Sequence, residues 1–181
     1  MAARPAAAVR WLDPIAGMLQ ATGIGEPGAY PFTPDLIEAW ARTGQLGRAA
    51  DRLAWLHDAD RWLDHPRARI TGCRAEAVLR LAEHAPVAAV GPVAAVIAEA
   101  RQLGLPFELG RCLLVLGTAQ RKARERRHAA ASLDEAIDTF SRLGAVRWQA
   151  LAVAQRARLA PGSGNPPRLP GDGSPSSSGR A

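Results

Sequence analysis

The sequence repeats itself every forty residues, and this feature constrains the fold more than any other. The pair Leu103-Gly104 recurs forty residues later as Leu143-Gly144, and Pro66 recurs at the same distance as Pro106. Small and apolar residues keep the same spacing: Ala49, Ala89 and Ala129; Leu53, Val93 and Leu133; Leu56, Val96 and Ala136. A period of this length is typical of chains built from repeated helix pairs, in which neighbouring units bury one continuous core.

Within each period the apolar residues recur at helical spacing, so each unit is predicted to be a pair of antiparallel helices. A proline opens several of these helices and a glycine ends others, which are the positions that each residue prefers. The predicted helices cover Ala6–Ala21, Pro34–Arg42, Leu46–Leu63, Pro66–Ala82, Ala85–Leu103, Pro106–Lys122, His128–Leu143 and Val146–Leu159. We therefore expect an all-α fold, an α-solenoid of about three tetratricopeptide-like hairpins, spanning residues 1–160.

The last hairpin has the spacing of a tetratricopeptide repeat. Gly117 and Ala129 are small at the two positions where paired helices approach most closely, and leucines stand beside them to fill the groove. The repeat scaffold predicted from this spacing is Leu113, Leu116, Gly117, Ala129, Leu133 and Ala136.

The composition changes abruptly after Ala160. The last 21 residues contain five prolines, five glycines and five serines, and Leu169 is their only large apolar side chain. Such a segment cannot bury enough apolar surface to offset the entropy lost on ordering. Residues 161–181 are therefore predicted to form a disordered tail.

Motifs that carry catalytic chemistry do not occur in the sequence. There is no GxxxxGK[ST] phosphate loop, no GxSxG, no HExxH and no CxxC. On a helix His57, Asp60 and Asp64 share one face, but Arg61 can pair with this face, so a solvated helical surface is a better interpretation than a metal site. We expect no enzymatic activity, no cofactor and no metal ion.

The location of the protein in the cell is predicted from three features of the sequence. The N-terminus lacks the apolar core of a signal peptide, and no uncharged apolar run is long enough to span a membrane. The two cysteines, Cys73 and Cys112, lie among apolar neighbours, as buried thiols do in a reducing compartment. These features predict a cytoplasmic protein without a membrane partner.

A basic cluster lies at the corner of the last hairpin. Five of the chain's 23 basic side chains fall within seven residues, namely Arg121, Lys122, Arg124, Arg126 and Arg127. They could contact phosphates weakly and without sequence preference. No aromatic residue is interleaved for base stacking and no groove-reading motif accompanies them, so a solvated corner is the preferred interpretation. Direct DNA binding by this chain is not expected.

Five tryptophans stand out in a chain that is only 5% aromatic. Large aromatic residues in helical repeats usually fill the core, but some line the concave face and anchor a partner. Trp62 and Trp148 lie near the ends of repeats and are the candidate partner-binding residues.

Two stretches together resemble a known family. These are GIGEPGAYPFTPDLIEAWARTGQLGRAADRLAWL and LGLPFELGRCLLVLGTAQRKARERRHAAASLDEAIDTFSRLGAVRWQALAVAQRARL, of which PFELGRCLLVLG and FSRLGAVRW are the most specific parts. From about Ala6 to Leu159 the chain resembles the helical-repeat region of the large ATP-binding LuxR-type transcriptional regulators of actinobacteria, relatives of the maltose regulator MalT. The resemblance implies a signal-sensing or scaffold segment between an ATP-binding module and a DNA-binding module.

The chain carries no residues that match either of those two modules. We therefore expect a truncated or frameshifted segment of such a regulator, and the alternative is a stand-alone tetratricopeptide-like adaptor that binds a protein partner. The predicted first and last helices are apolar on more than one side, whereas a self-sufficient repeat array needs polar end helices. This feature favours the truncated segment and predicts self-association or marginal stability.

Overall fold

The computed structural model describes residues 5–21, 31–63 and 65–160, without the side chains of residues 19–20 and 59–63. The described residues form helices and turns and contain no strand, which confirms the all-α prediction. The helices are α1 Pro5–Ala21, α2 Thr33–Arg42, α3 Leu46–Leu63, α4 Pro66–Ala82, α5 Pro86–Ala95, α6 Ile97–Gln102, α7 Pro106–Lys122, α8 Arg126–Arg142 and α9 Val146–Ala157. The predicted tail, residues 161–181, lies outside the described residues.

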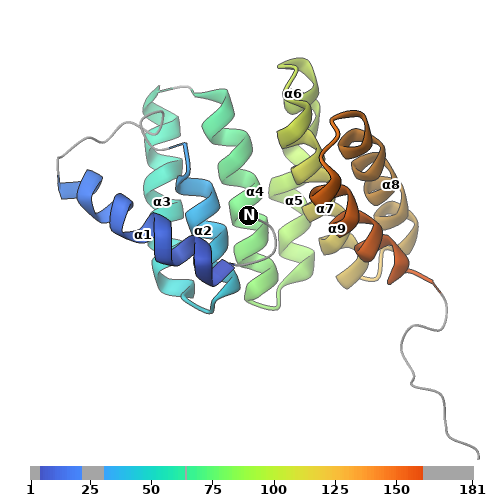
Figure 1. Ribbon diagram of the computed structural model, residues 1–181, viewed down its shortest axis with the longest axis horizontal. Coiled ribbons are helices and arrows are strands. Elements are labelled where there is room, and N and C mark those ends of the chain that lie inside the picture. Colours follow the sequence, from blue (N-terminus) through green and yellow to red (C-terminus); the bar gives the residue numbers. More distant parts are fainter. Residues whose placement is uncertain (1–4, 22–30, 64, 161–181) are drawn as a thin grey trace, which may run out of the picture.

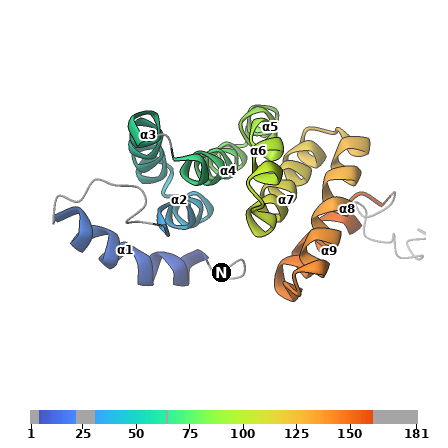
Figure 2. The ribbon, with the colours of Figure 1, turned by 90° about the horizontal axis from the view of Figure 1, so that it is seen from above.

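The chain runs from α1, α2 and α3 at one end of the molecule, through α4, α5 and α6, to α7, α8 and α9 at the other (Figure 1). Each helix packs against the next, and α2, α4, α7 and α9 also contact one another in that order. Seen from above, α1 and α9 lie at the two ends of the arrangement and on the same side of it (Figure 2). Helices far apart in the sequence therefore enclose one common face.

One continuous core runs through these helices, from Ala16 in α1 to Leu159 just after α9. Its fully buried side chains include Leu36, Ile70, Leu133 and Phe140. Burying a side chain of this size contributes about 1.5–3 kcal/mol. Since the core has no boundary between helix pairs, the helices are stabilised mainly by their neighbours.

The corners between helices share one backbone conformation. Five of the described residues have positive φ, and successive ones are twenty or forty residues apart: Gly44, His84, Gly104, Arg124 and Gly144. After each of them the next amide donates to a carbonyl five residues back, at 2.8 to 3.1 Å, in the bonds Gln45–Trp40, Ala85–Arg80, Leu105–Ala100, Glu125–Gln120 and Ala145–Phe140. This bond is the signature of the Schellman helix end. The Leu-Gly pairs seen in the sequence are two of these helix ends.

Substitutions at these corners are expected to change stability in opposite directions. Gly144→Ala should lower the free energy of unfolding by about 1 kcal/mol, because the left-handed conformation is costly for any residue with a Cβ atom. Arg124→Gly should raise it by up to about 1 kcal/mol for the same reason. Urea denaturation of both variants measures the two changes in the free energy of unfolding. Changes in the same direction would contradict this explanation.

Several predicted boundaries differ from the structure by one or two residues, and one predicted helix is divided. The helix predicted over Ala85–Leu103 is interrupted at Val96, between α5 and α6. Pro92 within α5 removes one helical amide donor, and its ring strains the preceding turn. The basic corner predicted over residues 123–127 is shorter, because α8 already begins at Arg126.

Candidate functional site

A groove of about 690 Å³ lies between α1 and α9. Its floor is made by α2, α4 and α7, and its walls by the two end helices. The lining includes Pro5 and Ala8 of α1; Asp35, Glu38 and Arg42 of α2; Arg74 and Val78 of α4; Phe107, Arg111, Leu114, Val115, Thr118, Arg121 and Lys122 of α7; and Trp148, Leu151, Gln155 and Arg158 of α9 or its C-cap. Residues from five helices thus meet at one site.

A buried ion network joins the three floor helices. The guanidinium of Arg74, whose side chain is 1% exposed, donates to Glu38 Oε1 of α2 at 2.6 Å and to Glu108 of α7. Arg111 of α7 donates to Asp35 of α2 and lies 3.3 Å from Glu38. Since each acid and each arginine belongs to a different helix from its main partner, the network fixes the spacing of the floor.

The charges of this network are set by their neighbours. Burial alone would raise the pKa of Glu38, but the positive charges of Arg74, Arg111 and Arg42 outweigh it and lower the pKa from 4.5 to about 2. Burial disfavours the charged form of Arg74, yet Glu38 and Glu108 raise its pKa above the usual value. Glu38 and Arg74 are therefore both ionised at neutral pH.

Cys112, the buried cysteine of α7, lies beside this network. Burial and the nearby carboxylates raise its pKa to about 12, against a smaller lowering by Arg74. Its thiol stays protonated at neutral pH and is not poised for nucleophilic chemistry.

Aromatic rings close one end of the groove. The Trp148 ring lies 5.7 Å from Phe107 and 5.9 Å from Phe140, measured between centroids. The Arg111 guanidinium lies 4.9 Å from the centroid of the same ring. Trp148, a residue predicted to bind a partner, is thus half-buried and held in place at the groove wall.

The other end of the groove is basic. Arg121 and Lys122 in the last turn of α7, together with Arg158 at the end of α9, line it. Among the described residues no carboxylate forms an ion pair with any of the three. Partial burial and the positive charge of Arg158 lower the pKa of Arg121. We call these three residues the basic end.

Several polar atoms on the lining have no hydrogen-bond partner within the described part of the chain. They are Nε of Arg111, Nε of Arg121 and Oε1 of Gln155, all buried. Buried polar atoms in proteins are nearly always hydrogen-bonded, because an unpaired one costs about 1–3 kcal/mol. Two donors and one acceptor on lining residues are therefore left without a partner, although the atoms themselves are shielded from solvent.

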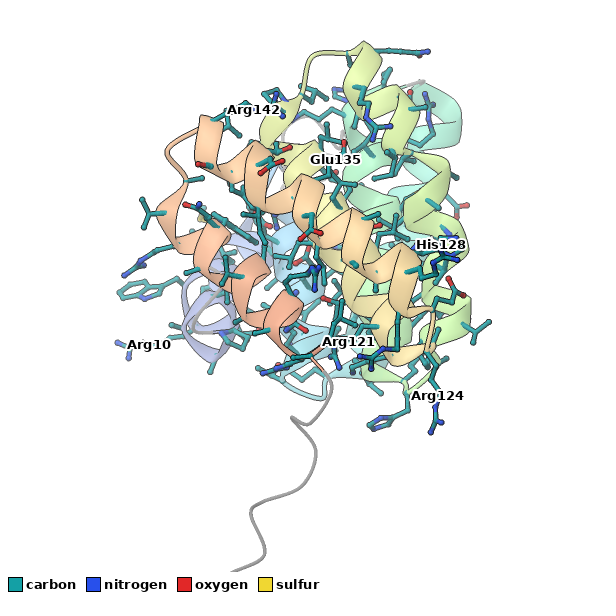
Figure 3. All side chains as sticks on the ribbon, turned by 90° about the vertical axis from the view of Figure 1, so that its right-hand side faces the viewer. Arg10, Arg121, Arg124, His128, Glu135 and Arg142 are labelled. Carbon is teal, nitrogen blue, oxygen red and sulfur yellow. The ribbon has the colours of Figure 1, made fainter. Side chains whose placement is uncertain are left out.

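The predicted basic cluster is divided between two places. Arg121 and Lys122 line the groove, whereas Arg124 lies in the corner and Arg127 is exposed on α8. Arg126 donates to the carbonyl of Leu159 and so ties the segment just after α9 to the start of α8. Figure 3 shows Arg121 beside the end of α9, with Arg124 and His128 on the other side of the corner. The five residues do not form one continuous surface.

The predicted repeat scaffold lies where α7 and α8 pack together. Leu113, Leu116, Ala129, Leu133 and Ala136 are all buried. A Cβ atom built on Gly117 would lie 2.5 Å from Leu133 Cγ and 3.2 Å from the Ala129 carbonyl oxygen. The helices therefore approach so closely that only glycine is accommodated there without a shift.

The other residues singled out from the sequence lie partly outside the described residues. The side chain of Trp62 lies outside the described residues, as do those of Asp60 and Asp64. His57, the remaining member of that trio, has its Nε2 4.0 Å from Glu76 Oε2. In the part of the chain that the structure describes, no group of three His, Cys, Asp or Glu side chains is arranged to hold a metal ion.

The two end helices expose apolar side chains. Trp11 and Met18 of α1 are 66% and 63% exposed, and Val146 of α9 is 71% exposed.

Within the described residues no helix is long and apolar enough to cross a bilayer.

The ion network and the unsatisfied groove atoms did not emerge from the sequence. The available signal was two charged residues in α2, one in α4 and two in α7, each set among apolar neighbours. Comparisons with family models, with curated proteins and with solved structures found no match for this chain.

Proposed function

We propose that this chain is a helical-repeat binding module that takes an extended ligand in its groove. In this proposal the helices form an α-solenoid of tetratricopeptide-like hairpins, α2 with α3, α4 with α5 and α6, and α7 with α8. The first helix of each hairpin lines the groove and the second covers the outer side. The observation that carries the proposal is the groove itself, lined by five helices and held open by a buried ion network.

The arrangement of the lining supports binding rather than catalysis. It combines ion-paired arginines, the Trp148 ring packed against Arg111, and a row of aliphatic side chains. Together these give the groove a fixed shape and a few fixed polar groups. Pockets of this kind bind through apolar contact and gain specificity from a few fixed polar groups. A concave surface shared by stacked helices is the usual binding surface of repeat proteins.

The resemblance to LuxR-type regulators gives the proposal a biological setting. There the module would sense a signal and pass it to ATP-binding and DNA-binding modules. Sequencing the DNA on both sides of the reading frame tests this setting. Coding stretches for both modules would support it, whereas unrelated genes on both sides would favour a stand-alone adaptor.

Binding in the groove is tested by selecting short peptides from a displayed random library on the full chain. Leu151→Gln in the groove should weaken the selected peptides roughly tenfold, because it removes apolar contact of about 1–1.5 kcal/mol. The matched control is Val153→Gln, on the exposed side of the same helix, which should leave affinity unchanged. Equal effects of the two variants, measured by fluorescence polarisation, would contradict groove binding.

A further inference from the structure

The groove presents two parallel stripes with the same chemical order. On α7 the stripe runs Leu114, Thr118, Arg121, and on the wall it runs Leu151, Gln155, Arg158. Both have the spacing of four and then three residues that keeps side chains on one face of a helix. The groove is therefore apolar between Leu114 and Leu151 and becomes cationic toward the basic end.

The positive charge at the basic end exceeds the partial negative charge of the two helix C-termini that lie there. Cations stabilise helix C-termini, and α7 and α9 both end here, each contributing about half a negative charge. Arg121, Lys122 and Arg158 carry three positive charges without a carboxylate partner among the described residues. About two positive charges remain uncompensated after the helix dipoles are counted.

The chemistry of the lining indicates which groups a ligand must bring. Arg121, Lys122 and Arg158 form a cationic cluster, so carboxylates suit it best. The carboxamide of Gln155, on the wall between Leu151 and Arg158, can pair with the amide of a peptide backbone. The aliphatic pair Leu114 and Leu151 needs an apolar side chain next to that amide.

We propose that the groove binds an extended acidic peptide segment, with its carboxylates at the basic end and a neighbouring apolar side chain between Leu114 and Leu151. This inference rests on the proposed function and names the chemistry of its ligand. A nucleic acid would also supply negative charge, but it offers no aliphatic group for the middle of the groove, and the basic residues outside the groove do not extend its path.

The test uses the same selected peptides and the full chain. They should carry aspartate or glutamate beside a large apolar residue, and Lys122→Glu/Arg158→Glu should weaken them more than about tenfold. The control, Arg127→Glu/Arg147→Glu, makes the same change in net charge at two exposed residues outside the groove and should alter affinity less than about twofold. Circular dichroism of both variants checks that they fold alike.

Each other outcome has a definite meaning. Peptides that lack acidic residues but respond to Leu151→Gln would overturn the inference and leave the groove as a binding site. Failure to select any peptide, or equal weakening by the two charge reversals, would also overturn it. Competition by oligo(dT), lost equally in both double variants, would assign the basic residues to nucleic acid instead.

Discussion

Replacing Arg74 with alanine is expected to lower the free energy of unfolding by about 3–5 kcal/mol, the largest effect of any single substitution considered for this chain. The guanidinium is 1% exposed and holds Glu38 and Glu108 on two other helices. Removing it leaves the buried carboxylates of Glu38 and Glu108 without their main partner. These unpaired buried charges are the source of the expected loss of stability. Urea denaturation followed by circular dichroism measures it.

The matched control on the same helix is Arg80→Ala. Arg80 pairs with Glu83 at 3.1 Å and with Glu76 at 3.5 Å, but its side chain is 41% exposed. Exposed pairs of this kind contribute at most about 1 kcal/mol. Similar losses for Arg74→Ala and Arg80→Ala would contradict a special role for the buried network.

The pH dependence gives this prediction a second signature. The folded-state pKa of Glu38 lies below its usual value, so its contribution is fully present above about pH 4.5 and is lost as the pH falls toward 2. Without Arg74 the carboxyl of Glu38 accepts a proton more readily in the folded state. The difference in free energy of unfolding between the wild type and Arg74→Ala should therefore become smaller as the pH falls from about 4.5 toward 2. If the two plots of stability against pH ran parallel, Glu38 would not be the group coupled to Arg74.

The second large effect is expected from Gly117→Val, which should lower the free energy of unfolding by about 2–3 kcal/mol. A Cβ atom at this position would already lie 2.5 Å from Leu133 Cγ, and Val adds two more carbons. Leu133 is fully buried and the Ala129 backbone is close, so α7 and α8 must move apart. Thermal unfolding of the variant measures the loss.

A rescue experiment separates overpacking from other causes. Leu133→Ala alone creates a cavity and destabilises the chain, but together with Gly117→Val it makes room for the new side chain. The double variant should then lose clearly less stability than the sum of the two single losses. Gly17→Ala, where nothing lies within 4 Å, is the control and should be neutral or slightly stabilising. Additive losses would rule out direct contact as the cause.

The helices were predictable from the sequence because the residues that end them recur with the forty-residue period. Gly104 and Gly144 end α6 and α8, and both have positive φ. The corner at Arg124, halfway between them, and the corner at His84, twenty residues before Gly104, adopt the same conformation without glycine. The shorter period of twenty residues was therefore hidden. The backbone hydrogen bond common to all these corners is not encoded by any one residue type.

The floor of the groove was not predictable because its charged residues do not follow the same period. In the forty-residue register Arg74 aligns with Pro34 and Leu114, not with its partners Glu38 and Glu108. The partners meet because α2, α4 and α7 pack side by side, which is a tertiary property. Trp148 was singled out as a candidate partner-binding residue, but its place over Arg111 depends on the same packing.

The most direct test of the central claim is to map a selected peptide on the isotopically labelled full chain by NMR. If the groove is the binding site, amide signals of α2, α4, α7 and α9 shift, with the largest changes around Leu114, Gln155 and the basic end. The outer surfaces of α3 and α8 stay unchanged. Shifts confined to α3 and α8, or spread evenly over the chain, would contradict a binding groove between α1 and α9.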